Sequence, residues 1–207
     1  MEQNYLPVWK SYHKALRHRN ALLKVDRMPT DEISGWERLM AEEGGKIDTM
    51  RQAYIKQLNV LLNGDLLPTV LTGNAHIEYQ PGYNENIALD QQLREERGDD
   101  VKRGFSSLGP HRSDIYFEFD DFTVARHLSR GQTKLYGAAL VAAQATLLKN
   151  NGLDSVMLVD DLDAELDETS TRKMLDLLLQ SESQTFVSSL VRKDWLPFNS
   201  SRDALFH

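Results

Sequence analysis

The sequence predicts an α/β fold with a parallel sheet, preceded by a helical-hairpin arm, and three observations lead to this class. Apolar residues recur at helical spacing through the first third of the chain. Helical and strand-like segments alternate in the last third, which is typical of parallel α/β architecture. The 207 residues, 41% hydrophobic and 27% charged, have the composition and length of a globular protein that buries a substantial core.

The segment up to about residue 67 is predicted to form two antiparallel helices. The first has an apolar face with members three, four and seven residues apart: Trp9, Tyr12, Leu16 and Leu23. Pro29 ends this helix, and Thr30 can cap the next. The second helix carries an apolar stripe every seven residues: Ile33, Met40, Ile47, Tyr54 and Leu61. We expect Gly44 and Gly45 to interrupt this second helix.

The rest of the chain is predicted to alternate between strands and helices. Strands are expected at residues 74–79 and 114–119, with a short charged helix at 86–96 and a hairpin turn at Asp120 and Asp121. The last third reads as a helix at 131–150, a strand at 156–160, a helix at 169–180 and a strand at 185–188. We therefore expect a helical arm over residues 1–73 and an α/β lobe over residues 74–207.

Composition and charge exclude several classes of function. A net charge of −7 gives no global basic field, so any nucleic-acid contact must come from a local patch or a partner. The chain has no cysteine, and its six histidines are scattered, which argues against disulfides and zinc. Residues 1–10 lack a secretory signal, and no apolar run approaches the ~18 residues of a membrane span. We expect a cytoplasmic protein.

Two adjacent carboxylates, Asp160 and Asp161, directly follow the apolar strand 156–159. An apolar run without alternation predicts a strand buried on both faces. Ligands of parallel α/β sheets bind at the carboxyl ends of the strands, where these two side chains lie. A strand followed by two acids is also compatible with a simple loop or helix-capping pair, so this pattern alone leaves both interpretations open.

Two further segments flank this strand at fixed distances. Upstream, Ser129, Arg130, Gly131 and Gln132 begin a long apolar helix, where backbone N–H groups can form an anion site. An ordinary serine cap before a core helix fits the same residues. Downstream, the segment 164–167 reads Ala-Glu-Leu-Asp, and either Asp167 or Thr169 can cap the helix that follows.

Taken in order, the segments LSRGQ, VMLVDD and AELD resemble the signature, Walker B and D-loop series of ABC-type ATPases. Other details are similar to the RecF family of DNA replication and repair ATPases. Leu108 to Asp114 reads LGPHRSD, similar to a GPHR-type segment, and Arg17 to Leu23 reads RHRNALL, similar to a QRNALL helix. The resemblance covers the chain from about Val8 to Phe206 and implies an ABC-ATPase-like C-terminal lobe.

The resemblance implies roles for individual residues. Asp160 would hold Mg²⁺, and Asp161 would be catalytic. The signature would act in trans on the ATP of a second subunit, through Ser129, Arg130, Gly131 and Gln132. Asp167 would meet the partner's D-loop across the dimer. His111, Arg112 and Ser189 are candidates by position alone, and Ser189 stands where ABC transporters place a switch histidine.

The family also implies a function and partners. A RecF-like protein would bind ATP and Mg²⁺, dimerise with ATP, bind DNA at gaps or junctions, and work with RecR and RecO in DNA repair, the SOS response and recombinase loading. Two small basic groups are available for DNA. They are Lys14, Arg17, His18, Arg19, Lys24 and Arg27 in the first helix, and Lys102, Arg103, His111 and Arg112 further on. A solvated helix face is the simpler explanation of the first group.

The phosphate-binding loop of P-loop ATPases does not occur in this sequence. Gly45-Lys46 is the nearest Gly-Lys pair, but Ile47 follows it and the segment is helical in pattern. We therefore expect a part of a longer protein, with a final strand starting at residues 205–207, and no measurable ATPase from the chain alone. The alternative is a non-catalytic module that binds protein or DNA and has lost nucleotide chemistry.

Overall fold

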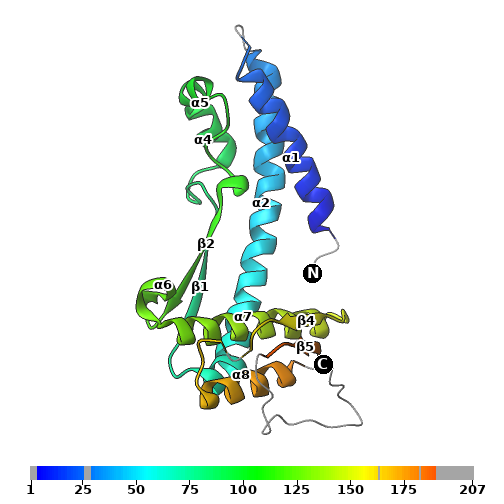
Figure 1. Ribbon diagram of the computed structural model, residues 1–207. Coiled ribbons are helices and arrows are strands. Elements are labelled where there is room, and N and C mark those ends of the chain that lie inside the picture. Colours follow the sequence, from blue (N-terminus) through cyan, green and yellow to red (C-terminus); the bar gives the residue numbers. More distant parts are fainter. Residues whose placement is uncertain (1–3, 26–28, 163, 182, 190–207) are drawn as a thin grey trace. The chain divides into compact units, whose positions relative to one another are not determined.

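The structure, a computed structural model, describes residues 4–25, 29–162, 164–181 and 183–189 (Figure 1). The chain forms two compact units, each built from two separate stretches. The first unit contains residues 1–60 and 75–124, and the second contains residues 61–74 and 125–207. The chain passes from one unit to the other at three points, after residues 60, 74 and 124. The domain boundary expected from the sequence, between residues 73 and 74, lies next to the second of these points. Arg27 and residues 205–207 lie outside the described residues.

The first unit is built on two helices, α1 (Tyr5–Leu22) and α2 (Thr30–Leu61), which lie side by side in Figure 1. The predicted helical hairpin is confirmed. Its core is made by the apolar faces of both helices together with α4 (Leu89–Glu95). The buried members of this core are Tyr12, Ala15, Leu16, Met40, Ile47, Leu89 and Leu93.

The helix α2 runs through Gly44 and Gly45 without a break, so the expected interruption is wrong. The reason is tertiary packing around Gly44. A Cβ atom on this residue would lie 3.2 Å from Leu89 Cδ2 and 3.3 Å from Pro110 Cγ. Gly44 therefore permits a close approach of neighbouring segments, and that packing offsets the low helix propensity of glycine.

An antiparallel ribbon of β1 (Ala75–Gln80), β2 (Asp114–Phe119) and β3 (Phe122–Thr123) belongs to the same unit. Its second turn is the predicted hairpin turn. Asp120 and Asp121 both have positive φ, 48° and 65°, as a tight turn with primed geometry requires. Between β1 and β2 the chain forms α4, α5 (Arg97–Arg103) and the short 3-10 helix η2 (Pro110–Arg112).

A buried polar network holds α1, α2, α4 and α5 together. Arg19 of α1 is fully buried and bonds Glu37 at 3.1 Å, Asp100 at 2.7 Å and the Ser106 hydroxyl at 2.7 Å. Its remaining nitrogen donates to the Leu93 carbonyl. Arg19 is therefore part of the interior, and its place among the surface cations of the first helix is corrected. Burial of this charge is tolerated because carboxylates and acceptors surround it.

The second unit contains the π-helix η1 (Leu62–Leu66) and the helices α3 (Leu67–Val70), α6 (Val124–His127), α7 (Arg130–Asn150) and α8 (Glu168–Gln180). Its two strands, β4 (Val156–Val159) and β5 (Gln184–Val187), pair in parallel, as the sequence predicts. None of the described helices has the length and apolar character of a membrane span.

The strand β4 is buried on one face only, which corrects the expectation of burial on both. The Met157 side chain enters the core with 5% exposure, whereas Val156 and Leu158 are 58% and 79% exposed. In the described residues the sheet has two strands, and the exposed Val156 and Leu158 lie on the face opposite to Met157. An apolar sheet face therefore stays open to solvent.

Candidate functional site

The carboxyl ends of the parallel strands β4 and β5 bring Asp160 next to Ser188. The Ser188 hydroxyl donates a hydrogen bond of 2.6 Å to Asp160 Oδ1. The same oxygen of Ser188 accepts the Asp161 backbone N–H at 2.9 Å, and the Ser188 carbonyl accepts the Leu162 N–H at 3.0 Å. The Asp160 carboxylate is thus oriented at an exposed strand end while the backbone after it turns.

The start of α7 is joined to the turn that follows Asp160. Lys134 Nζ, one turn into the helix, donates to the Asp161 carbonyl at 2.7 Å and to the Ala164 carbonyl at 3.0 Å. Gly131 lies against the same turn, because a Cβ atom there would approach the Glu165 carbonyl oxygen to 3.0 Å. Asp161 and Glu165 both have positive φ, 48° and 62°. Gly131 of the LSRGQ segment is therefore in contact with Glu165 of AELD. Lys134, two residues after LSRGQ, bonds both Asp161 of VMLVDD and Ala164 of AELD.

Ser129 and Gln132 form a capping box at the start of α7. Ser129 Oγ accepts the Gln132 N–H, and the Gln132 side chain accepts the Ser129 N–H at 2.9 Å. This arrangement provides acceptors for two of the backbone N–H groups that have no partner within the helix at its N-terminus. Because the Ser129 hydroxyl acts here as an acceptor, its own proton remains the group that can donate to an anion.

Arg130 and Asp167 flank this centre. Arg130 makes a long ion pair of 3.7 Å with Glu165, and its side chain is 89% exposed, so this pair contributes little to stability. Asp167 is the N-cap of α8, where its carboxylate accepts the Ser170 N–H at 2.7 Å. This hydrogen bond from the Ser170 backbone holds the pKa of Asp167 below its usual range.

The GPHR-type residues belong to the first unit, where a side chain of α1 holds one of them in position. His111 Nδ1 lies 2.7 Å from the Tyr12 hydroxyl, and Nε2 lies 3.1 Å from the Ser106 carbonyl oxygen. Arg112 is exposed, with its guanidinium carbon 4.9 Å from the centre of the Phe105 ring. These contacts are structural ones within the first unit.

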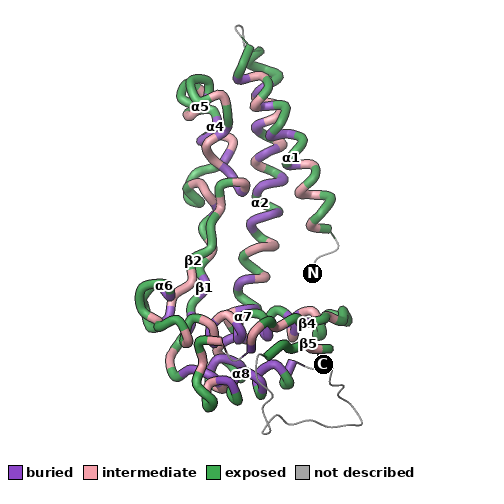
Figure 2. The backbone as a smooth tube through the Cα atoms, viewed as in Figure 1, coloured by how far each residue is buried: buried purple, intermediate pink, exposed green. Residues whose placement is uncertain are grey.

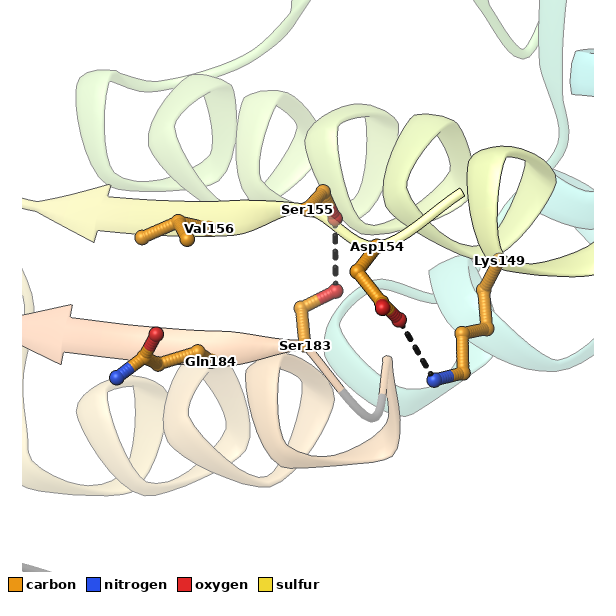
Figure 3. A pocket seen from close by; sticks show the side chains of 6 residues that line it. All are labelled: Lys149, Asp154, Ser155, Val156, Ser183 and Gln184. Atoms are coloured by element: carbon orange, nitrogen blue, oxygen red, sulfur yellow. Dashed lines mark hydrogen bonds and ion pairs between the residues drawn. The ribbon is translucent and has the colours of Figure 1, made fainter. Parts of the chain in front are cut away.

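A shallow pocket lies at the opposite, amino ends of β4 and β5 (Figure 3). Its walls include Ser155 and Ser183, whose hydroxyls are 2.9 Å apart, and Lys149, which pairs with Asp154 at 3.0 Å. Ligands of parallel sheets bind at the carboxyl ends. The pocket is therefore separate from the centre around Asp160.

Two residues of this centre were not singled out in the sequence. Ser188 is the last residue of a predicted strand, as Asp160 is, and parallel pairing of the two strands would have placed it beside Asp160. Lys134 carries no such signal, because a lysine in the first turns of a helix is ordinary in sequence. Ser189, the candidate by position, follows Ser188 and is exposed.

Comparison with known proteins gives a consistent picture. The chain is 31% identical over 191 residues to the DNA replication and repair protein RecF of Acinetobacter baumannii, covering 92% of this chain and 53% of that protein. The RecF of Coxiella burnetii is 33% identical over 192 residues, again covering 92% of this chain and 53% of that protein. No family model matches.

A solved structure, that of the recombination mediator protein RecF-ATP in the RecFOR pathway, has the same fold. It matches with a TM-score of 0.77 and 25% identity, over 93% of this chain and 54% of that chain. The chain thus spans about half the length of the relatives it matches. A match over 92% of this chain takes in parts of both compact units. Over nearly its whole length this chain is similar to RecF proteins.

Proposed function

We propose that this chain provides the signature, Walker B and D-loop motifs of an ATP site in a DNA replication and repair ATPase of the RecF type. The observation that carries the proposal is the pair of hydrogen bonds from Lys134 to the Asp161 and Ala164 carbonyls. They tie the helix that begins with the signature to the turn that follows Asp160. Three segments that are individually weak motifs are thereby one physical unit.

In this proposal Asp160 and Asp161 act on the ATP bound to their own subunit. Mg²⁺ would neutralise phosphate charge, and a single carboxylate supplemented by water is the kind of site it accepts. Asp160 fits this role because its carboxylate is exposed at a strand end and is oriented by Ser188. No group of three or more acidic or histidine side chains that could enclose a metal occurs among the described residues. Asp161 would position the attacking water.

The start of α7 would act on ATP held by a second subunit. A helix of 21 residues directs a partial positive charge and unpaired N–H groups from its N-terminus. The Ser129 hydroxyl proton and the Gly131 N–H would donate to a γ-phosphate oxygen, and exposed Arg130 would add a cation. Gln132 would keep this end of the helix in shape through the capping box. Asp167 would lie at the dimer contact between D-loops.

The whole protein would couple this site to DNA. The similar proteins are named for DNA replication and repair and, in one solved structure, for recombination mediation in the RecFOR pathway. We infer that a homodimer assembled on ATP binds DNA at gaps or junctions and cooperates with RecR and RecO in recombinase loading. Nucleotide hydrolysis would then release the dimer.

The second candidate is a non-catalytic interaction module. It is favoured by one observation, the absence from this sequence of any G-x-x-x-x-G-K-[ST] segment to bind the α- and β-phosphates. Such a module would keep the fold and bind protein or DNA without nucleotide.

The test is ATP hydrolysis and ATP-dependent dimerisation of the chain extended by its upstream coding sequence. We expect slow hydrolysis that Asp160→Ala abolishes. The matched control is Asp154→Ala, an exposed aspartate at the other end of the same strand, which should keep wild-type turnover. Turnover that survives Asp160→Ala would contradict the role given to Asp160, and no effect of nucleotide on the extended protein would favour the interaction module.

A further inference from the structure

The exposed side of α1 carries a line of cations. Lys10, Lys14 and Arg17 fall within an arc of about 60° on the helix, at 100° per residue. Lys24 follows two residues beyond the end of α1. All four residues are exposed, and we refer to them as the α1 stripe. From Lys10 to Lys24 the stripe extends about 21 Å, at ~1.5 Å per residue.

The charge of the α1 stripe is not offset locally. The helix contains no aspartate or glutamate, although the chain as a whole has a net charge of −7. Within the described part of the chain, no stripe residue makes an ion pair. In contrast, several exposed cations of α2, α4 and α5 are paired with neighbouring acids, as in Lys46 with Glu42 and Arg94 with Asp90. The stripe is therefore available to an external anion.

A second basic group adjoins the end of the stripe. A Cβ atom on Gly104 would lie 3.7 Å from Lys24 Cε, so this lysine borders the loop that carries Phe105 and Arg112. Arg112 lies exposed over the Phe105 ring, which is itself 42% exposed. The two basic groups that are far apart in sequence are thus brought together at the C-terminal end of α1.

We propose that the α1 stripe binds the sugar-phosphate backbone of nucleic acid. A straight row of cations along a helix matches the repeated charges of a phosphodiester strand. An anionic membrane would need a free apolar helix face beside the cations. That face of α1 is occupied, because Tyr12, Ala15 and Leu16 are buried against α2 and α4 (Figure 2).

The inference rests on the proposed role in DNA repair for the choice of DNA, and it adds the contact surface. The contact would be independent of sequence, because the stripe offers charges and no base-reading geometry. It also needs no nucleotide, so it is testable on the chain as it exists. A failed ATPase experiment and a failed stripe would therefore be recognised separately.

The experiment measures fluorescence anisotropy of a labelled 25-base-pair duplex with the 207-residue chain at several salt concentrations between about 50 and 200 mM. The variant Lys10→Glu/Lys14→Glu/Arg17→Glu reverses three stripe charges. The matched control, Arg38→Glu/Lys56→Glu/Arg126→Glu, makes the same change in net charge at exposed positions on α2 and α6. Circular dichroism and thermal unfolding establish that both variants keep the fold.

The stripe variant should bind at least about tenfold more weakly at low salt, and its plot of log affinity against log salt should flatten by about 3. The control should stay close to wild type. Equal losses in both variants, or no loss in the stripe variant, would overturn the proposal. The proposal would also be overturned if the chain did not bind the duplex but bound vesicles of anionic phosphatidylglycerol through the stripe.

Discussion

His111 has a defined tautomer because of what faces its two ring nitrogens. Nε2 points at the Ser106 carbonyl, which can only accept, so Nε2 carries the proton and donates. Nδ1 is then the acceptor for the Tyr12 hydroxyl. Position 109, next to this pair of side chains, requires glycine. Its φ is 128°, and a Cβ atom there would collide with the Tyr12 hydroxyl. The GPHR-type segment thus fastens the loop before β2 to α1.

This arrangement predicts a pH dependence of stability. Burial lowers the pKa of His111 below its usual value of 6.5, so the folded chain resists protonation more than the unfolded chain does. The stabilising contribution is present above pH 6.5 and is lost as the pH falls from there through the folded pKa. The midpoint of urea unfolding should drop more between pH 7.5 and 5.5 for wild type than for His111→Gln. Equal drops would contradict the prediction.

Elements differ in how far the sequence alone predicts them. The stripe of Ile33, Met40 and Ile47 predicted the buried face of α2, because all three side chains are fully buried. Met40 and Ile47 pack there with residues of α1 and α4. In contrast, α5 was not predicted. Its one buried residue is Asp100, which is held by Arg19 from far away in sequence, so no apolar periodicity marks the helix. Long-range polar contacts leave no local pattern to read.

The glycines of α2 give a matched pair of substitutions. Nothing lies within 4 Å of a Cβ atom built on Gly45, so Gly45→Ala should raise the free energy of unfolding by about 0.5–1 kcal/mol through helix propensity. Gly44→Ala should gain less or destabilise, because Leu89 and Pro110 would have to move. Denaturant unfolding of both variants measures the difference. If the two substitutions had the same effect, packing at Gly44 would not be the reason that α2 is continuous there.

On the scale of the whole chain, the order of the motifs predicted which segments lie together. It did not predict the hydrogen bonds that hold these segments in place. The signature-like, Walker B-like and D-loop-like segments do lie together in the second unit. Ser188 and Lys134, which fasten them, were missed. A hydrogen bond to a backbone carbonyl depends on the conformation of the turn. Asp161 adopts a left-handed backbone conformation in this turn, and the sequence did not predict it.

The second unit also exposes an apolar sheet face. Val156 and Leu158 of β4 point to the same side, and Leu158 is paired in register with Phe186 of β5. Their exposed fractions are 58%, 79% and 46%. Contiguous apolar surface of this kind favours association, whereas scattered exposed apolar residues do not.

We therefore expect the 207-residue chain to associate as its concentration rises, and Leu158→Lys to suppress this association. The lysine places a charge at the centre of the open face, where burial in a contact would require desolvation. Val141→Lys is the control, since Val141 is a 49% exposed apolar residue of α7 outside the sheet. Sedimentation velocity over a hundredfold range of concentration measures the effect. A wild-type chain with a constant sedimentation coefficient, or equal suppression by both lysines, would show that the sheet face does not drive association.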